Sequence, residues 1–210
     1  MKAVVISGGQ PLSVARAQVH LNGADYVICA DKGAEYAELY GIVPNLIVGD
    51  MDSIDELKLA EYTKSKIIKS SREKDYTDTH LAIIKALAAG AKEITVLCAT
   101  GLRSDHAIAN IRLLLFIKEN GSTGKIVDDE NTISLCTGET VFHNKKGMTV
   151  SILSLSDVAQ GINLEGFKYP LIEYNAGLDW TKGISNEITS NYARVSINSC
   201  CLLIFEIHNA

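Results

Sequence analysis

Two aspartates, Asp50 and Asp52, lie one residue apart directly after the apolar run Leu46–Val48. Because a strand points alternate side chains to the same face, the two carboxylates can lie together. Like charges held this close repel one another unless a cation or a hydrogen-bond donor lies between them. The pattern therefore predicts either a metal site or a polar turn in which Asp52 or Ser53 caps the following helix.

Acidic residues and glycines follow other strand-like runs of the sequence. Asp31, Lys32 and Gly33 come after the run YVICA, the segment Lys74–Asp78 comes after SKIIKSSRE, and Gly101–His106 comes after EITVLCA. The carboxyl ends of parallel strands meet at one edge of an open sheet, where ligands bind. Glycine lets the backbone approach a ligand closely. We therefore expect these segments to surround one common site.

The acids at these ends favour a hard cation, since Mg²⁺ is commonly held by carboxylates, water and substrate phosphates. Basic side chains nearby would neutralise the charge of a transferring phosphate. No GxxxxGK[ST] segment and no kinase-type glycine loop occur in the sequence, so we exclude an ordinary P-loop. The predicted chemistry is metal-assisted phosphoryl or pyrophosphoryl transfer, with Mg²⁺ held by Asp50, Asp52, Asp78 and Asp105 beside Lys32, Lys74 and Arg103.

The elements that would position these residues change character along the chain. The first 129 residues alternate short Val- and Ile-rich runs with helical patterns, the clearest of them in residues 77–90 and 105–121. This alternation is typical of a parallel sheet with crossover helices. The later residues form many short strand-like runs separated by turn residues. The sequence predicts a Rossmann-like α/β domain in residues 1–129 and an all-β sandwich in residues 130–210.

Composition limits the classes of function and the compartment. The chain has 210 residues, a net charge of −5 and a pI of about 5.5, which argues against nucleic acid or an anionic membrane as a partner. No apolar stretch is long enough to span a bilayer, and the apolar run at the N-terminus is too short for a signal peptide. The five cysteines form no CxxC pair, which favours free thiols in a reducing compartment. We therefore expect a cytoplasmic protein.

The sequence resembles a known family in five motifs. In order along the chain they are ADKGA, GDMDSI, KDYTDTHLAI, GLRSDHAIANIRLL and GISNE, and together they are similar to the motif set of the thiamine pyrophosphokinases. The resemblance implies transfer of a pyrophosphoryl group from ATP to the hydroxyl of thiamine with Mg²⁺, giving thiamine pyrophosphate and AMP. It further implies that the first domain binds nucleotide and Mg²⁺ and catalyses the reaction. The second domain would bind thiamine and form a homodimer whose subunits share the active site.

The resemblance also implies roles for the residues that match the family motifs. Asp50 and Asp52 match acids that bind metal and phosphate, and Asp78 matches a metal-binding or catalytic carboxylate. Arg103 is expected to contact the triphosphate, and Asp105 to bind metal or polarise the attacking hydroxyl. The remaining matches are expected to bind the nucleotide or, in the last two cases, thiamine: Asp31, Lys32, Gly33, Asp75, Thr77, His106, Ser185 and Asn186.

Three positions depart from the family pattern. Glycine is usual at Lys32 and at Leu102, and glutamate is usual at His80. None of the three is one of the acids, or the arginine, to which the resemblance assigns a role, so we expect activity to be retained.

Simpler interpretations exist for several residues and for the whole chain. Asp31 and Asp105 suit helix caps as well as a site, and His106 suits a buried structural position. Trp180 suits stacking on thiamine, although a core or interface position is the favoured interpretation. Two other functions would use the same acids, namely a metal-dependent phosphohydrolase that activates water and a non-catalytic module that binds nucleotide or thiamine.

Overall fold

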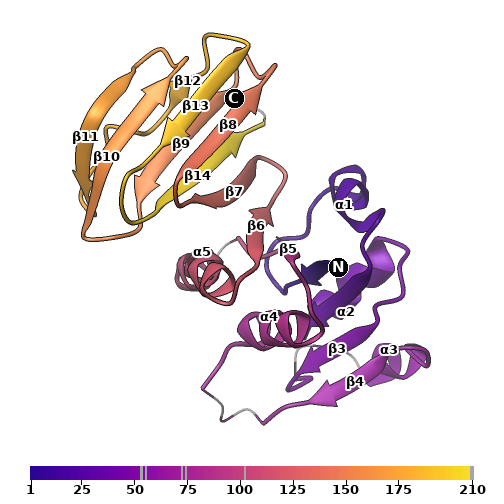
Figure 1. Cartoon of the computed structure of the whole chain (residues 1–210). Helices are drawn as coiled ribbons and strands as arrows, with labels where there is room; N and C mark the ends of the chain where they lie inside the picture. The colour runs from indigo at the N-terminus through magenta and orange to yellow at the C-terminus, as the bar shows by residue number, and fades with distance from the viewer. Residues whose placement is uncertain (53, 55, 72, 74, 102, 209–210) are drawn as a thin grey trace. The chain divides into compact units, whose positions relative to one another are not determined.

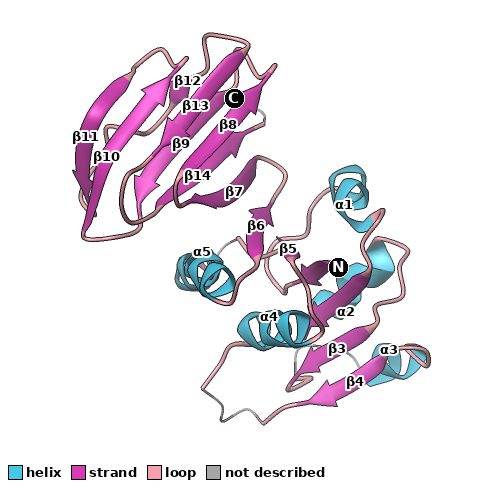
Figure 2. Cartoon of the chain, viewed as in Figure 1, coloured by secondary structure: helices cyan, strands magenta, loops and turns pink. Residues whose placement is uncertain are grey.

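The chain folds into two compact units, Met1–Asp129 and Glu130–Ala210 (Figure 1). A computed structural model describes residues 1–52, 54, 56–71, 73, 75–101 and 103–208. Among these described residues, helices occur in the first unit and the second is built from strands (Figure 2). An α/β unit followed by a β-sandwich is the architecture that the sequence predicts, and the structure confirms it.

The first unit alternates strands and helices along the chain. In order, they are β1 (Lys2–Ile6), α1 (Val14–Leu21), β2 (Tyr26–Ala30), α2 (Gly33–Leu39), β3 (Leu46–Gly49), α3 (Glu56–Glu61), β4 (Lys66–Lys69), α4 (Asp78–Ala88), β5 (Glu93–Leu97), α5 (Ser104–Glu119) and β6 (Thr123–Val127).

The strands of this unit pair in parallel in the order β4-β3-β2-β1-β5-β6. The chain runs outward from β1 to β4 and then returns through α4 to β5, on the other side of β1. The strand order therefore reverses between β1 and β5, and ligands of open α/β sheets bind at such a reversal. Every residue of β3 and four of the five residues of β1 are buried, as expected for strands covered on both faces.

Helices α4 and α5 begin beside two of the predicted site motifs. The Thr77 side chain caps α4 by accepting a hydrogen bond from the His80 backbone N–H at 3.3 Å. Helix α5 starts at Ser104, with Arg103 at the cap position and Asp105 inside the first turn. The interpretation of Asp105 as the helix cap is therefore wrong, because the helix begins one residue earlier. An acid in the first turn still interacts favourably with the helix dipole.

The second unit consists of antiparallel strands in two sheets. They are β7 (Asn131–Cys136), β8 (Glu139–His143), β9 (Thr149–Ser154), β10 (Val158–Glu165), β11 (Leu171–Gly177), β12 (Asn186–Glu187), β13 (Tyr192–Ser196) and β14 (Leu202–Ile207). Within this unit the neighbours are β11-β10-β13-β8 in one sheet and β12-β9-β14-β7 in the other. Their inner faces share one apolar core that includes Phe142, Ile152 and Val195, which defines a sandwich. Among the described residues, no helix is long and apolar enough to cross a membrane.

Candidate active site

Three carboxylates gather at the carboxyl ends of β2 and β3. Asp31 follows β2, and Asp50 and Asp52 follow β3. One carboxylate oxygen of each residue lies within 4.8 Å of the corresponding oxygens of the other two. Asp31 and Asp50 are half-buried and Asp52 is exposed. The pairing of Asp50 with Asp52 that their spacing predicts is therefore present in the structure, and it gains a third acid.

The backbone brings these carboxylates together through left-handed residues. Met51 has a φ of 64° and Asp31 a φ of 47°, a region that side chains other than glycine seldom adopt. The turn at Met51 lets the Asp52 N–H donate to Asp50 Oδ1 at 3.1 Å. A β-carbon on Gly49 would lie 3.0 Å from the Asp31 Cβ and 3.1–3.2 Å from its backbone Cα and N, so glycine allows the two strand ends to approach.

This group of acids has the chemistry of a site for a divalent cation. Three carboxylates at this distance repel one another, and a divalent cation between them removes the repulsion. Carboxylate oxygens at the end of a sheet, with one face open to solvent, suit Mg²⁺, which keeps several of its waters. Asp78 and Asp105 do not belong to this group or to any similar group in the described part of the chain, so their assignment as metal ligands stays a prediction.

Asp78 is the first residue of α4, and its helix is attached to the end of β1. The hydroxyls of Ser7, directly after β1, and Thr79 share a buried hydrogen bond. This bond fixes the first turn of α4, and with it Asp78, against the strand end. Asp75 and Thr77 lie exposed just before the helix.

Arg103 and Asp105 form a bidentate ion pair at the start of α5. Arg103 Nε and Nη2 donate to the two carboxylate oxygens of Asp105 at 3.1 and 2.6 Å. These bonds hold the pKa of Asp105 well below its usual range, and they raise the pKa of Arg103. Both side chains are exposed, and so is His106. The buried structural interpretation of His106 is therefore wrong.

The segment after β2 contains a glycine that close packing requires, Gly33, and an exposed lysine, Lys32. A β-carbon on Gly33 would lie 2.1 Å from the Ile6 carbonyl oxygen, so this glycine lets α2 begin directly against the end of β1. Lys32 is exposed at the same turn.

Among the departures from the family pattern, His80 packs edge-on between the rings of Tyr76 and Phe116. Leu102, Ser53 and Lys74 lie outside the described residues.

In the second unit, the predicted thiamine turn holds another turn in place. Asn186 is buried, with 2 % of its surface exposed. Its side-chain oxygen accepts from the Tyr169 N–H at 3.0 Å, and its side-chain nitrogen donates to the Tyr169 carbonyl at 2.8 Å. Ser185 has a φ of 55°, and its N–H donates to Ser151 Oγ at 2.9 Å. Asn186 thus holds the backbone of Tyr169 in place through two hydrogen bonds.

Tyr169 is a candidate binding residue that the sequence interpretation missed. Tyr169 is 59 % exposed, and the Lys168 ammonium group lies 5.9 Å from the centre of its ring. The signal available in the sequence is weak, since it consists of one aromatic residue before Pro170 in a turn. Trp180, by contrast, lies in the core of the sandwich beside Tyr174, which agrees with the favoured interpretation of a core residue.

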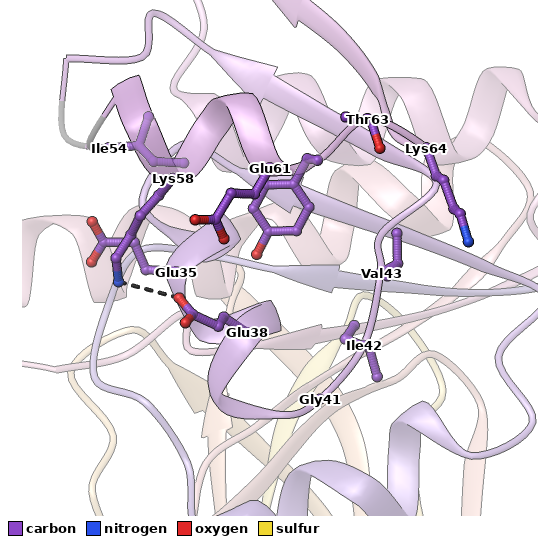
Figure 3. A pocket seen from close by; sticks show the side chains of 11 residues that line it. Glu35, Glu38, Gly41, Ile42, Val43, Ile54, Lys58, Glu61, Thr63 and Lys64 are labelled. Carbon is purple, nitrogen blue, oxygen red and sulfur yellow. Dashed lines mark hydrogen bonds and ion pairs between the residues drawn. The ribbon is translucent and has the colours of Figure 1, made fainter.

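A cavity of about 370 Å³ lies between α2 and α3 of the first unit (Figure 3). Its wall includes Ile42, Ile54 and Tyr62, and Lys58 forms an ion pair with Glu38 across it at 3.2 Å. None of the residues predicted to form the site lines this cavity. The candidate active site is therefore the open edge of the sheet.

Comparisons with known proteins agree with this arrangement. The family description "Thiamin pyrophosphokinase, catalytic domain" matches residues 17–124, and "Thiamin pyrophosphokinase, vitamin B1 binding domain" matches residues 131–202. The chain is 32% identical to the thiamine pyrophosphokinase of Bacillus subtilis over 165 residues, which is 77% of each protein.

Solved structures extend the likeness to the whole chain. The crystal structure of the Bacillus subtilis thiamine pyrophosphokinase has a TM-score of 0.88 at 25% identity, with 100% of both chains covered. The Geobacillus thermodenitrificans thiamin pyrophosphokinase gives 0.83 at 25% identity, covering 100% of this chain and 99% of that one. With the two family domains matched in order, these findings show that the chain belongs to the thiamin pyrophosphokinase family.

Proposed function

We propose that the protein transfers a pyrophosphoryl group from ATP to the hydroxyl of thiamine, giving thiamine pyrophosphate and AMP. The observation that carries this function is the ordered match of a catalytic domain and a vitamin B1 binding domain of one family across the chain. The hydroxyl oxygen attacks the β-phosphorus of ATP, and the bond from that phosphorus to the oxygen shared with the α-phosphate breaks. AMP leaves with that oxygen.

We assign the Mg²⁺ site to Asp31, Asp50 and Asp52, since their carboxylates already meet at the ends of β2 and β3. Bound there, Mg²⁺ would neutralise phosphate charge and favour the departure of AMP. Asp31, which the motif comparison placed with the nucleotide, thereby becomes a metal ligand. This assignment also supports the predicted catalytic role of Asp50 and Asp52.

Asp78 is the residue that we propose to accept the proton of the thiamine hydroxyl. It is half-buried at the start of α4, and the Ser7–Thr79 bond fixes that turn. Asp105 is less suited to this role, because both of its oxygens accept hydrogen bonds from Arg103. Arg103 is exposed and can exchange Asp105 for the triphosphate, since guanidinium binds phosphate with the same fork of donors.

Thiamine binding is proposed for the second unit. Tyr169 presents an exposed ring, and aromatic faces suit flat heterocycles and cations. Asn186 supports this ring by holding the backbone of Tyr169. Ser185, the residue before Asn186 in the sequence, is exposed.

Assembly and location complete the proposal. We propose a homodimer whose subunits share the active site; exposed apolar residues on and beside the edge strand β11, namely Tyr169, Ile172 and Leu178, support a surface between copies. We also propose a cytoplasmic location. Four cysteines are free thiols, which suits a reducing compartment: Cys29, Cys98, Cys136 and Cys200.

The activity is tested by incubating the protein with ATP, Mg²⁺ and thiamine and separating the products by chromatography. Equal amounts of AMP and thiamine pyrophosphate support the proposal. Phosphate release that does not require thiamine would indicate a phosphohydrolase instead. Binding of ATP or thiamine without any product would indicate a non-catalytic module.

A further inference from the structure

The loops that follow β1 and β5 run side by side where the strand order reverses. Beyond the ends of the strands, the Gly9 N–H donates to the Cys98 carbonyl at 2.7 Å, and the Gln10 N–H donates to the Thr100 carbonyl at 2.8 Å. The loop after β5 leads, three residues after Thr100, to Arg103 at the start of α5. The loop after β1 therefore sets the path of the segment that carries Arg103.

The two loops are too close for side chains to separate them. A β-carbon on Gly9 would lie 2.3 Å from the Thr100 carbonyl oxygen and 2.5 Å from that of Cys98. A β-carbon on Gly101 would lie 3.0 Å from the Gln10 nitrogen. Because backbone packs directly on backbone here, a shift of the first loop must be passed on to the second.

Tyr36, from α2, holds the first loop from its other side. Its hydroxyl donates to the Gly9 carbonyl at 2.8 Å. Gly9 is thus fixed through both of its backbone polar groups, with Cys98 accepting from the N–H and Tyr36 donating to the carbonyl. Burial raises the pKa of Tyr36, with a smaller contribution from Cys98, so the hydroxyl keeps the proton that it donates.

We propose that Tyr36 is a positioning residue for ATP, because its bond to Gly9 fixes the loop after β1, to which the loop that carries Arg103 is hydrogen-bonded. The proposal rests on the proposed contact between Arg103 and the triphosphate. Tyr36 is not a catalytic residue, since its hydroxyl is used on the backbone of Gly9.

The test replaces one hydroxyl and compares it with a matched change. Tyr36→Phe removes the bond to Gly9 and keeps the ring. Tyr62→Phe is the control, because the Tyr62 hydroxyl also donates to a backbone carbonyl, that of Ala34, at 2.5 Å. For Tyr36→Phe we expect the KM for ATP to rise about fivefold, the factor that corresponds to one typical net hydrogen bond, with the KM for thiamine unchanged. Tyr62→Phe should leave both KM values unchanged.

A double variant shows whether the effect passes through Arg103. When Arg103→Lys is already present, Tyr36→Phe should change the KM for ATP by less than about twofold, because coupled residues are not additive. Three results would overturn the proposal: an unchanged KM for ATP in Tyr36→Phe, an equal rise in the KM for thiamine, or the same rise with and without Arg103→Lys.

Calorimetry of ATP binding, made on the same variants, separates this inference from the proposed function. If the unmodified protein makes no thiamine pyrophosphate, the proposed function fails. The dissociation constants for ATP still decide the role of Tyr36, by the same comparison between variants.

Discussion

At the scale of single residues, the candidate metal site depends on strained backbone. Asp31 and Met51 both adopt left-handed conformations at strand ends, and each such residue costs on the order of 1–3 kcal/mol. Strain of this size persists where the surrounding structure holds the residue in place. Here Gly49 leaves room for the backbone of Asp31. The strain is located at the three carboxylates, which supports a function for them beyond that of a polar turn.

Asp31→Asn tests the metal site without disturbing this backbone, because asparagine tolerates the left-handed region. We expect the Mg²⁺ concentration for half-maximal activity to rise at least about 10- to 100-fold, the loss that changes in outer-shell residues already cause. Without Mg²⁺, the melting temperature should rise, since one of three repelling charges is removed. Activity against Mg²⁺ concentration and thermal unfolding measure both effects. Asp157→Asn, at an exposed acid of the second unit, is the control, and unchanged Mg²⁺ dependence in Asp31→Asn would contradict the assignment.

The Arg103–Asp105 pair predicts a pH dependence of stability. The pKa of Asp105 is depressed by the hydrogen bonds from Arg103, so its contribution is fully present above the pKa of an unfolded aspartate, about 3.9. The contribution is lost as the pH falls below that value toward the folded pKa. Thermal unfolding of the wild type and Asp105→Asn should therefore differ by a constant amount above about pH 5 and converge in more acid solution. The difference should shrink with added salt, because both groups are exposed. A difference that grows on acidification would refute this prediction.

At the scale of elements, short turns decide which side chains are presented. The turn at Asn186 and the turn at Tyr169 are distant in sequence, but one buried amide joins them. Tyr169, which is exposed, and Asn186, which is buried and holds it, have different functions. Truncating each of them should therefore have different effects on thiamine binding and on stability.

Truncating each residue separates these two functions. Tyr169→Ala should raise the KM for thiamine about 2- to 10-fold, as expected for one aromatic stacking contact, with little change in stability. Asn186→Ala should also destabilise the protein by about 1–3 kcal/mol, because it leaves backbone groups of Tyr169 unsatisfied. Steady-state kinetics and urea unfolding measure the two quantities. Tyr192→Ala, at another half-exposed tyrosine of this unit, should leave the KM for thiamine unchanged. A normal KM in Tyr169→Ala would exclude stacking on this ring.

At the scale of the whole molecule, the chain divides its chemistry between two units. The first unit supplies acids, the basic side chains Lys32 and Arg103, and glycine loops at a sheet edge. The second unit supplies an exposed aromatic residue and an edge strand with apolar residues. Ile172 is 84 % exposed on that edge strand and Leu178 is 62 % exposed directly after it. Exposed apolar groups of this kind often mark contacts between proteins.

Ile172→Lys therefore tests the proposed dimer. The unmodified protein should sediment as a dimer, and the variant should shift toward the monomer, since a charge placed in an apolar contact must be desolvated. Analytical ultracentrifugation over a range of protein concentrations measures the shift. Val19→Lys, at a similarly exposed apolar residue of α1, is the control. A monomeric unmodified protein, or a variant that dimerises normally, would refute the proposed surface.

The sequence by itself determined the order of the two folds and the chemistry of the first one. The reason is that burial on both faces, helical period and turn residues are local patterns, and that Asp50, Asp52, Arg103 and Asp105 lie within short motifs. Only the tertiary structure decided which distant residues meet. Asp31 joins Asp50 and Asp52 because adjacent parallel strands end together and Gly49 admits the Asp31 backbone. Tyr169 is presented by Asn186, 17 residues away in the sequence, a contact that follows from the packing of two turns and leaves no periodic signal.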